Sequence, residues 1–273
     1  MNPLELVALT PKNNCGDCGY PACLAFAVAV TKGGISALGC PHIDPARLPE
    51  ELARESAGTG LDQVARGQEE RDMTLVAHLK SKVRGLDFAS LAERVGAKWE
   101  ADQSGELSFR YLGRQVRIGP DRVSMDSQEL VDPRDQILLY NYLAFGGGEP
   151  PCGEWVGMES LPNSISKVRT LDTYCQQRIS ERFTGRGNRL AALCRELDGR
   201  EEAGQSADMA VMVPVLPRVP LLVLFWDEEP EDGFAATTKI LFDQRVMDFL
   251  DLESLVFAAE RFADRLAEMD SNE

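Results

Sequence analysis

Apolar residues recur at helical spacing in two clear segments of the chain. Between residues 73 and 100 they follow a period of three to four residues with an interruption near Gly85, which predicts two consecutive helices. Residues 132–148 predict a further helix, because Pro133 suits the first turn of a helix and Gly146 suits its end.

Alternation of apolar and polar residues predicts strands elsewhere. Residues 107–119 alternate on both sides of Gly113, which is the signature of a hairpin. Residues 207–216 and 220–229 read as two strongly apolar strands, and residues 237–250 contain a third.

The pattern as a whole predicts an α+β protein. Residues 152–200 predict mostly helix, and residues 252–269 predict an amphipathic helix whose apolar face carries Leu255, Ala258, Ala259, Phe262 and Leu266. We therefore expect a mixed domain with a mostly antiparallel sheet and helices on one or both of its faces.

The first 48 residues differ from the rest of the chain. Residues 1–10 predict a short strand or a helical turn, and the apolar residues after Cys23 predict a compact helix that stops at Gly33-Gly34. Residues 50–71 are polar and glycine-containing, as in a linker with partial helix. The predicted organisation is a small loop-and-helix module over 1–48, a linker over 49–71 and an α+β domain over 72–273.

Composition narrows the classes of function. The 273 residues carry a formal charge of −15, which argues against nucleic-acid binding because that depends on Lys and Arg. No apolar run is long enough to span a bilayer, and the N-terminus lacks the features of a signal peptide, so we expect a cytoplasmic protein. Seven cysteines in such a protein favour metal binding over disulfides.

Four of these cysteines form a compact motif with the pattern C-x2-C-x4-C-x16-C, made of Cys15, Cys18, Cys23 and Cys40. Gly16 and Gly19 allow the tight loop that this spacing demands, and such a loop points backbone N–H groups inward. Cys23 lies at the start of the predicted helix, where the helix dipole favours a thiolate. The pattern favours an iron–sulfur cluster. Zinc and unrelated reduced cysteines stay open as alternatives, although zinc ribbons commonly use two C-x2-C pairs.

The module is similar to a known cluster-binding module. The stretch NCGDCGYPACLAFAVAV and the later GCP resemble the small 4Fe-4S module at the N-terminus of the corrinoid iron–sulfur protein large subunit. They also resemble a module in the B subunit of the Rnf-type electron-transport complex. The resemblance covers about residues 5–45, and the matching residues are Asn14, Cys15, Gly16, Cys18, Gly19, Cys23, Phe26, Ala27, Cys40 and Pro41. It implies that Cys15, Cys18, Cys23 and Cys40 are the ligands of a 4Fe-4S cluster.

The remainder resembles a domain of unknown function that follows such modules in anaerobic bacteria and archaea. The matching segments are DQILLYNYLAFGGG, GEWVGMESLPN, PRVPLLVLFWDEE and KILFD. This resemblance implies no reaction. The barrel domain of the corrinoid protein is not evident, so corrinoid binding is not implied.

The remaining cysteines and the two histidines are weaker candidates. Cys175 and Cys194 lie on predicted helices, where a free cysteine is usually a small buried hydrophobe, whereas Cys152 lies in a loop. His42 is expected to face solvent or the cluster, and His78 is expected to pack on an apolar helix face. So few histidines give little support to Ser/His/Asp or Cys/His catalysis.

Three further features outside the module have both a structural and a functional interpretation. The preferred interpretation of Gly146-Gly147-Gly148 is a helix stop, and the alternative is a loop around a ligand, although it lacks the lysine of a P-loop. Arg218, between two prolines, is a candidate for a ligand carboxylate or phosphate. The preferred interpretation of the acidic cluster over 227–232 is a solvated turn, and the alternative is a docking or cation site.

Three functions follow from these features. The first is a redox protein, a one-electron 4Fe-4S carrier or an accessory to an anaerobic enzyme system that includes corrinoid or one-carbon chemistry, with a redox partner protein. The second is an enzyme whose C-terminal domain binds a small molecule and receives electrons from the cluster. The third is a redox-sensing regulatory protein. The sequence assigns no catalytic residue.

Overall fold

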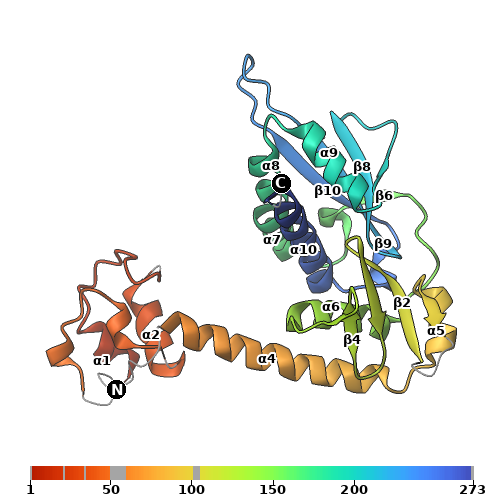
Figure 1. The fold of residues 1–273 in the computed structure, drawn as a ribbon. Coiled ribbons are helices and arrows are strands. Elements are labelled where there is room, and N and C mark those ends of the chain that lie inside the picture. Colours follow the sequence, from red (N-terminus) through yellow and green to blue (C-terminus); the bar gives the residue numbers. More distant parts are fainter. Residues whose placement is uncertain (1, 21, 34, 50–59, 101–104, 272–273) are drawn as a thin grey trace. The chain divides into compact units, whose positions relative to one another are not determined.

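The computed structural model describes residues 2–20, 22–33, 35–49, 60–100 and 105–271 (Figure 1). Contacts divide the chain into two compact units, Met1–Thr74 and Leu75–Glu273. Helix α4 (Gly60–Val83) contains this boundary. Part of the predicted linker, residues 50–59, lies outside the described residues, and the limits predicted for the module, the linker and the C-terminal domain stay predictions.

The N-terminal unit begins with two α-helices. In α1 (Pro3–Val7), the Asn2 side chain accepts a hydrogen bond from the Glu5 N–H, and the Glu5 carboxylate accepts one from the Asn2 N–H. This reciprocal cap stabilises a helix of five residues where the sequence allowed either a strand or a helical turn. Helix α2 (Cys23–Gly33) begins at Cys23, as predicted.

Two 3-10 turns, η1 (Ala37–Gly39) and η2 (Pro45–Arg47), complete this unit. Its core is a separate cluster of buried side chains from α1, α2 and the turns. The members are Leu6, Phe26, Ala27, Val30, Ile35, Ala37, Cys40, Ile43 and Leu48. One of the motif cysteines, Cys40, is therefore part of the core.

The C-terminal unit contains two five-stranded antiparallel sheets, whereas a single sheet was expected from the sequence. The first has the order β1-β2-β3-β4-β5, formed by Lys98–Glu100, Glu106–Tyr111, Arg114–Ile118, Val123–Met125 and Gln128–Glu129. The predicted hairpin joins β2 and β3. Leu112 and Gly113 have φ of 47° and 76° in its turn, as a two-residue turn between twisted strands requires.

The second sheet has the order β6-β10-β9-β8-β7. Its strands are Trp155–Gly157, Thr237–Asp243, Val219–Trp226, Met209–Leu216 and Arg200–Glu201, in that order. Every residue of β9 except Trp226 is buried, as in a central strand that is covered on both faces. The Leu112 N–H donates to the Val215 carbonyl at 3.0 Å, so the hairpin of the first sheet is bonded to β8 of the second.

Helices occupy most of the predicted positions. They are α5 (Phe88–Arg94), α6 (Pro133–Phe145), α7 (Ile165–Leu171), α8 (Gln177–Phe183), α9 (Gly187–Glu196) and α10 (Leu252–Ser271). The interruption near Gly85 separates α4 from α5. Two 3-10 turns, η3 (Met158–Ser160) and η5 (Val246–Asp248), lie on the connections.

A wide π-turn, η4 (Asp172–Gln176), joins α7 to α8 and was not predicted. It presents the Gln176 side chain to β10, where Gln176 Oε1 accepts a hydrogen bond from the Ile240 N–H at 2.9 Å. The π-turn thereby satisfies a backbone donor that the three-residue strand β6 does not reach.

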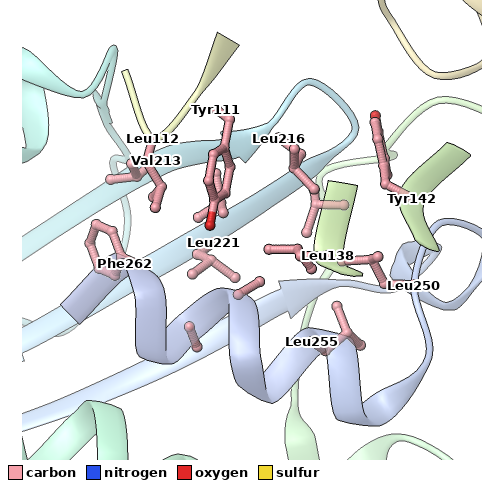
Figure 2. Close-up of a cluster of buried hydrophobic side chains, with 14 of the residues drawn as sticks. Tyr111, Leu112, Leu138, Tyr142, Val213, Leu216, Leu221, Leu250, Leu255 and Phe262 are labelled. Atoms are coloured by element: carbon pink, nitrogen blue, oxygen red, sulfur yellow. The ribbon is translucent and has the colours of Figure 1, made fainter. Parts of the chain in front are cut away.

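The core of the C-terminal unit lies where α6 and α10 meet side chains of both sheets (Figure 2). The predicted apolar face of α10 is buried at all five positions. At the edge of this core, Arg261 of α10 binds Asp135 of α6 through two hydrogen bonds of 2.8 Å, and the Tyr111 hydroxyl donates to the same carboxylate at 2.8 Å. One buried carboxylate therefore ties β2, α6 and α10 together.

No helix among the described residues is long and apolar enough to cross a membrane.

Candidate metal centre

The cysteine loop between α1 and α2 has an unusual backbone. Lys12, Asn14, Gly16 and Gly19 have φ of 57°, 52°, 81° and 81°, all in the left-handed region. No protein atom lies within 4 Å of the place that a Cβ would take at Gly16 or Gly19. The backbone conformation, rather than the space around it, therefore favours glycine at both positions.

Side chains of the two asparagines fix the ends of this loop. Asn14 Oδ1 accepts a hydrogen bond from the Cys23 N–H at 2.9 Å, which satisfies a donor at the start of α2 from nine residues away. Asn13 Oδ1 accepts one from the Cys15 N–H at 3.3 Å. Between them, the Gly19 N–H donates to the Gly16 carbonyl at 2.8 Å and closes a tight turn.

The four motif cysteines differ in burial. Cys15 is exposed, Cys18 is half-buried, and Cys23 and Cys40 are buried. Burial raises the pKa of the Cys40 thiol, and negative charge on Cys18, Cys15 and Cys23 raises it further. Cys40 therefore lies within electrostatic range of the other three motif thiols.

Hydrogen bonds favour the thiolate form at Cys23. The Thr10 hydroxyl lowers the pKa of this thiol most, and the backbone N–H of Asn14 lowers it next. Thiolates, not thiols, bind metals, so this environment prepares Cys23 as a ligand.

A second group of potential ligands lies on the exposed side of the loop. One ligand atom each from Cys15, Asp17 and His42 lies within 4.8 Å of the others. His42 Nε2 is 2.6 Å from Asp17 Oδ2, and this contact, followed by a hydrogen bond with Cys15, lowers the pKa of Asp17. His42 is exposed, as expected, but the sequence did not indicate Asp17, which is 25 residues away from its partner.

The other cysteines lie outside this centre. Cys175 and Cys194 are completely buried, as predicted, and burial raises the pKa of both thiols, that of Cys194 to about 12. Cys152 is exposed and its Sγ lies 3.6 Å from Asp243 Oδ1. None of the three is close in sequence to the cysteine loop.

The remaining candidates have structural partners. Gly146 is the left-handed end of α6, as predicted, and Gly147 and Gly148 lie so close to Phe249 and Asp248 that a Cβ would collide with them. Arg218 donates to the Glu93 carbonyl at 3.1 Å, which holds its guanidinium against the chain itself.

His78 is exposed, so the expectation that it packs on an apolar face is wrong. The buried stripe of α4 passes through Val76, Leu79 and Val83, and His78 is turned away from it.

The acidic cluster over 227–232 includes one carboxylate with a clear structural role. Asp227 accepts hydrogen bonds from the N–H groups of Gly185 and Gly187 at 2.7 and 3.3 Å, next to the start of α9. Burial alone would raise the pKa of Asp227, but these N–H groups and that of Glu228 lower it overall. Asp227 is therefore an anionic cap of α9.

A cavity of about 630 Å³ lies beside this cap, between α9, β8 and the loop over 202–208. Its size is within the range of small-ligand sites. Neither Cys152, nor the glycine loop, nor Arg218 lines it, so this cavity does not bring those three candidates together.

Two family models match the chain. One, described as "Putative Fe-S cluster", matches residues 11–42, which include all four motif cysteines. The other, described as "Domain of unknown function (DUF3786)", matches residues 87–265. These matches confirm the resemblances of both parts of the chain.

One curated protein supports the same view. The corrinoid/iron-sulfur protein large subunit of Moorella thermoacetica is 38% identical over 138 residues, which cover 46% of this chain and 30% of that protein. Most of that relative therefore has no counterpart in the match. No solved structure matches the chain. Together, the module match and this relative support iron–sulfur binding.

Proposed function

The chain belongs to the family described as "Domain of unknown function (DUF3786)", and we propose that it is a redox protein with a 4Fe-4S cluster in its N-terminal unit. The proposed ligands are Cys15, Cys18, Cys23 and Cys40. The observation that carries the proposal is that all four cysteines of the motif lie within the residues that match the Fe-S model.

The donor set fits such a cluster. Four thiolates are the common ligands of a 4Fe-4S cluster, and one of the four, Cys40, belongs to a core that also contains Phe26 and Val30. A four-thiolate zinc site is the competing chemistry, but its usual pair of C-x2-C knuckles differs from C-x2-C-x4-C. When bound, the cluster would supply one-electron transfer.

The chain's own residues would position and tune the site. Asn14 holds the start of α2 and so fixes the place of Cys23. The backbone N–H groups of Lys12 and Asn14 donate toward the Cys23 sulfur, and hydrogen bonds to ligand sulfurs are one of the means by which proteins set reduction potentials. The exposed Cys15 is on the side from which an electron would leave.

We further propose a role as electron carrier or accessory to an anaerobic enzyme system, with a separate redox partner protein. The support is the name of the relative, which describes it as the large subunit of a corrinoid/iron-sulfur protein. A cytoplasmic location is part of this proposal, since it rests on thiols that stay reduced. The acidic composition gives no support to a nucleic-acid partner.

The experiment is anaerobic purification followed by iron and sulfide analysis and electron paramagnetic resonance after reduction. The wild-type protein is expected to contain about four irons and four sulfides per chain and to show the signal of a reduced cluster. Cys18→Ala should lose most of the iron, whereas Cys152→Ala, a substitution of an exposed cysteine outside the motif, should keep it. A colourless protein with one zinc would contradict the proposal.

A further inference from the structure

Asp17 lies beside Cys15, the exposed cysteine of the motif. Its carboxylate is hydrogen-bonded to Cys15, and its Oδ2 lies 2.6 Å from His42 Nε2. One ligand atom from each of these three residues lies within 4.8 Å of the other two. Metal–ligand bonds of about 2.0–2.3 Å allow two ligands of one ion to lie up to about 4.6 Å apart. Asp17 is therefore within reach of a metal that Cys15 would hold.

The other three motif cysteines differ from Cys15 in their surroundings. Within the part of the chain that the structure describes, Cys18, Cys23 and Cys40 belong to no group of three side chains whose ligand atoms are this close. Cys40 is also part of the core of the unit, where a carboxylate in its place would bury a charge. Cys15 is therefore the motif position at which an alternative ligand is available.

The chemistry favours Asp17 over His42 as that ligand. A carboxylate carries one negative charge, as a thiolate does, so its replacement of Cys15 leaves the total charge of the ligands unchanged, whereas a neutral imidazole changes it. Iron accepts carboxylate oxygen atoms as ligands in proteins. A carboxylate that binds a metal is normally hydrogen-bonded in turn, and His42 provides this partner. The side chains of His42 and Asp17 are 42% and 52% exposed, so a small movement of either does not disturb the core.

The exposure of Cys15 makes an alternative ligand useful. Oxidants and alkylating reagents reach an exposed thiolate before they reach a buried one. With Asp17 beside it, loss of the Cys15 thiolate would not leave an iron without a protein ligand.

We propose that Asp17 is an alternative ligand, which binds the iron of Cys15 whenever that thiolate is absent or modified, and that His42 is the positioning residue that orients the Asp17 carboxylate. This inference rests on the proposed function and adds one residue to the cluster site beyond the four cysteines.

The first experiment compares four single variants, Cys15→Ala, Cys18→Ala, Cys23→Ala and Cys40→Ala. Each is purified anaerobically without small thiols, which would otherwise replace the missing ligand, and is weighed by native mass spectrometry. Cys15→Ala is expected to keep a mass increase equal to four irons and four sulfides, whereas the other three variants should lose it. The electron paramagnetic resonance signal of reduced Cys15→Ala should differ from that of the wild type, because one ligand atom is oxygen rather than sulfur.

Substitutions of Asp17 and His42 assign their separate roles. Asp17→Ala should keep the cluster when Cys15 is present and lose it in the Cys15→Ala background. In the same background, His42→Ala should speed cluster loss to a chelator by about tenfold or more, because loss of the partner of a metal ligand weakens metal binding by about that factor. His42→Gln keeps a hydrogen-bond donor, so it should restore both the slower loss and the resonance signal of Cys15→Ala. A residue that only supported the fold would not change that signal.

Chemical labelling gives a test that does not depend on the folding of Cys15→Ala. Iodoacetamide is added to cluster-loaded Cys152→Ala, which lacks the exposed cysteine outside the motif. Chains labelled at Cys15 should retain four irons and four sulfides, whereas labelled chains of Cys152→Ala/Asp17→Ala should not.

Three results would overturn the inference while the wild type carries its cluster. One is a Cys15→Ala variant that loses the cluster as readily as the other three, and another is a mass increase in Cys15→Ala that lacks one iron. The third is a cluster that stays in Cys15→Ala/Asp17→Ala, which would assign the position to water or to His42. Absence of the cluster in the wild type would instead refute the proposed function itself.

Discussion

The buried pair of Arg261 and Asp135 makes a sharp prediction about stability. Replacing Arg261 with Met keeps most of the side-chain volume but removes both 2.8 Å hydrogen bonds to the carboxylate. The Asp135 side chain is 3% exposed, so its charge would remain in the interior with Tyr111 as its main partner. We expect Arg261→Met to destabilise the C-terminal unit.

The burial of the pair determines how large the loss of unfolding free energy should be. Breaking a buried ion pair by removing one partner costs about 3–5 kcal/mol, because the other charge is left uncompensated. Removing both charges with Asp135→Leu in addition leaves the Tyr111 hydroxyl without its acceptor, which costs about 1–3 kcal/mol. Asp264 also loses its 3.3 Å hydrogen bond from Arg261 but keeps its ion pair with Arg178. The double variant should therefore be more stable than Arg261→Met alone.

Urea unfolding followed by tryptophan fluorescence measures this effect in the relevant unit. The three tryptophans, Trp99, Trp155 and Trp226, all lie in the C-terminal unit. Arg84→Met is the control, because Arg84 and Asp121 form a pair at 2.6 Å whose side chains are 62% and 64% exposed. Such a pair contributes about 1 kcal/mol or less.

Two results would refute the reasoning. One is a loss in Arg261→Met that is no larger than the loss in the control. The other is a double variant whose loss of unfolding free energy equals the sum of the losses in Arg261→Met and Asp135→Leu measured singly. Effects of independent sites add, whereas those of coupled sites do not.

Four further predictions follow from particular contacts. Asn14→Ala removes the acceptor for the Cys23 N–H, at a cost of about 1 kcal/mol. A chelator should therefore remove the cluster faster from this variant, as followed by visible absorption. Equal rates of cluster loss in variant and wild type would contradict this role of Asn14. Gly19→Ala should lower the stability of the N-terminal unit by about 1–2 kcal/mol, because φ at Gly19 is 81°, whereas Gly85→Ala, at an open position, should change the thermal unfolding curve little. A thiol reagent should label Cys152 in the native protein but reach Cys175 and Cys194 only after unfolding, since both are buried and burial raises their pKa; rapid native labelling of all three would argue against the buried positions. Asp270→Asn should lower the free energy of unfolding at pH 7, because Arg186 above all holds the pKa of Asp270 below its ordinary 3.8. The ionised Asp270 contributes this stability fully above pH 3.8, and the contribution is lost as the pH falls through the lowered pKa. The urea midpoints of variant and wild type should therefore converge in acid.

Local signals explain which elements the sequence predicts well. Helix α6 has Asp132 as its cap, Pro133 in its first turn and Gly146 in the left-handed conformation at its end. Each of these depends only on adjacent residues, so the sequence pattern determines the helix limits. The turn at Gly113 is predictable for the same reason.

The unpredicted strands are short and depend on their neighbours. Strands β5 and β7 have two residues each, and β1, β4 and β6 have three, so no alternation can be recognised in them. β1, β4, β6 and β7 each pair with a longer strand, and β5 pairs with β4, so all five depend on neighbours that are distant from any local signal. That is why a single sheet was expected where two are present.

The candidate site also has a part that the sequence predicts and a part that it does not. The spacing and residue types identify Cys15, Cys18, Cys23 and Cys40 as a group, because thiols at close spacing have few other uses in a reduced protein. The contact between Asp17 and His42 joins residues 25 positions apart and depends on how the loop folds. It could be found only in the structure.

Native mass spectrometry of the anaerobically purified protein tests the central claim most directly, because it weighs the bound group on the intact chain. The account predicts a mass increase equal to four irons and four sulfides in the wild type and in Cys152→Ala, and its loss in Cys18→Ala. A mass increase equal to a single zinc ion in the wild type, or an equal iron–sulfur mass in Cys18→Ala, would contradict the account.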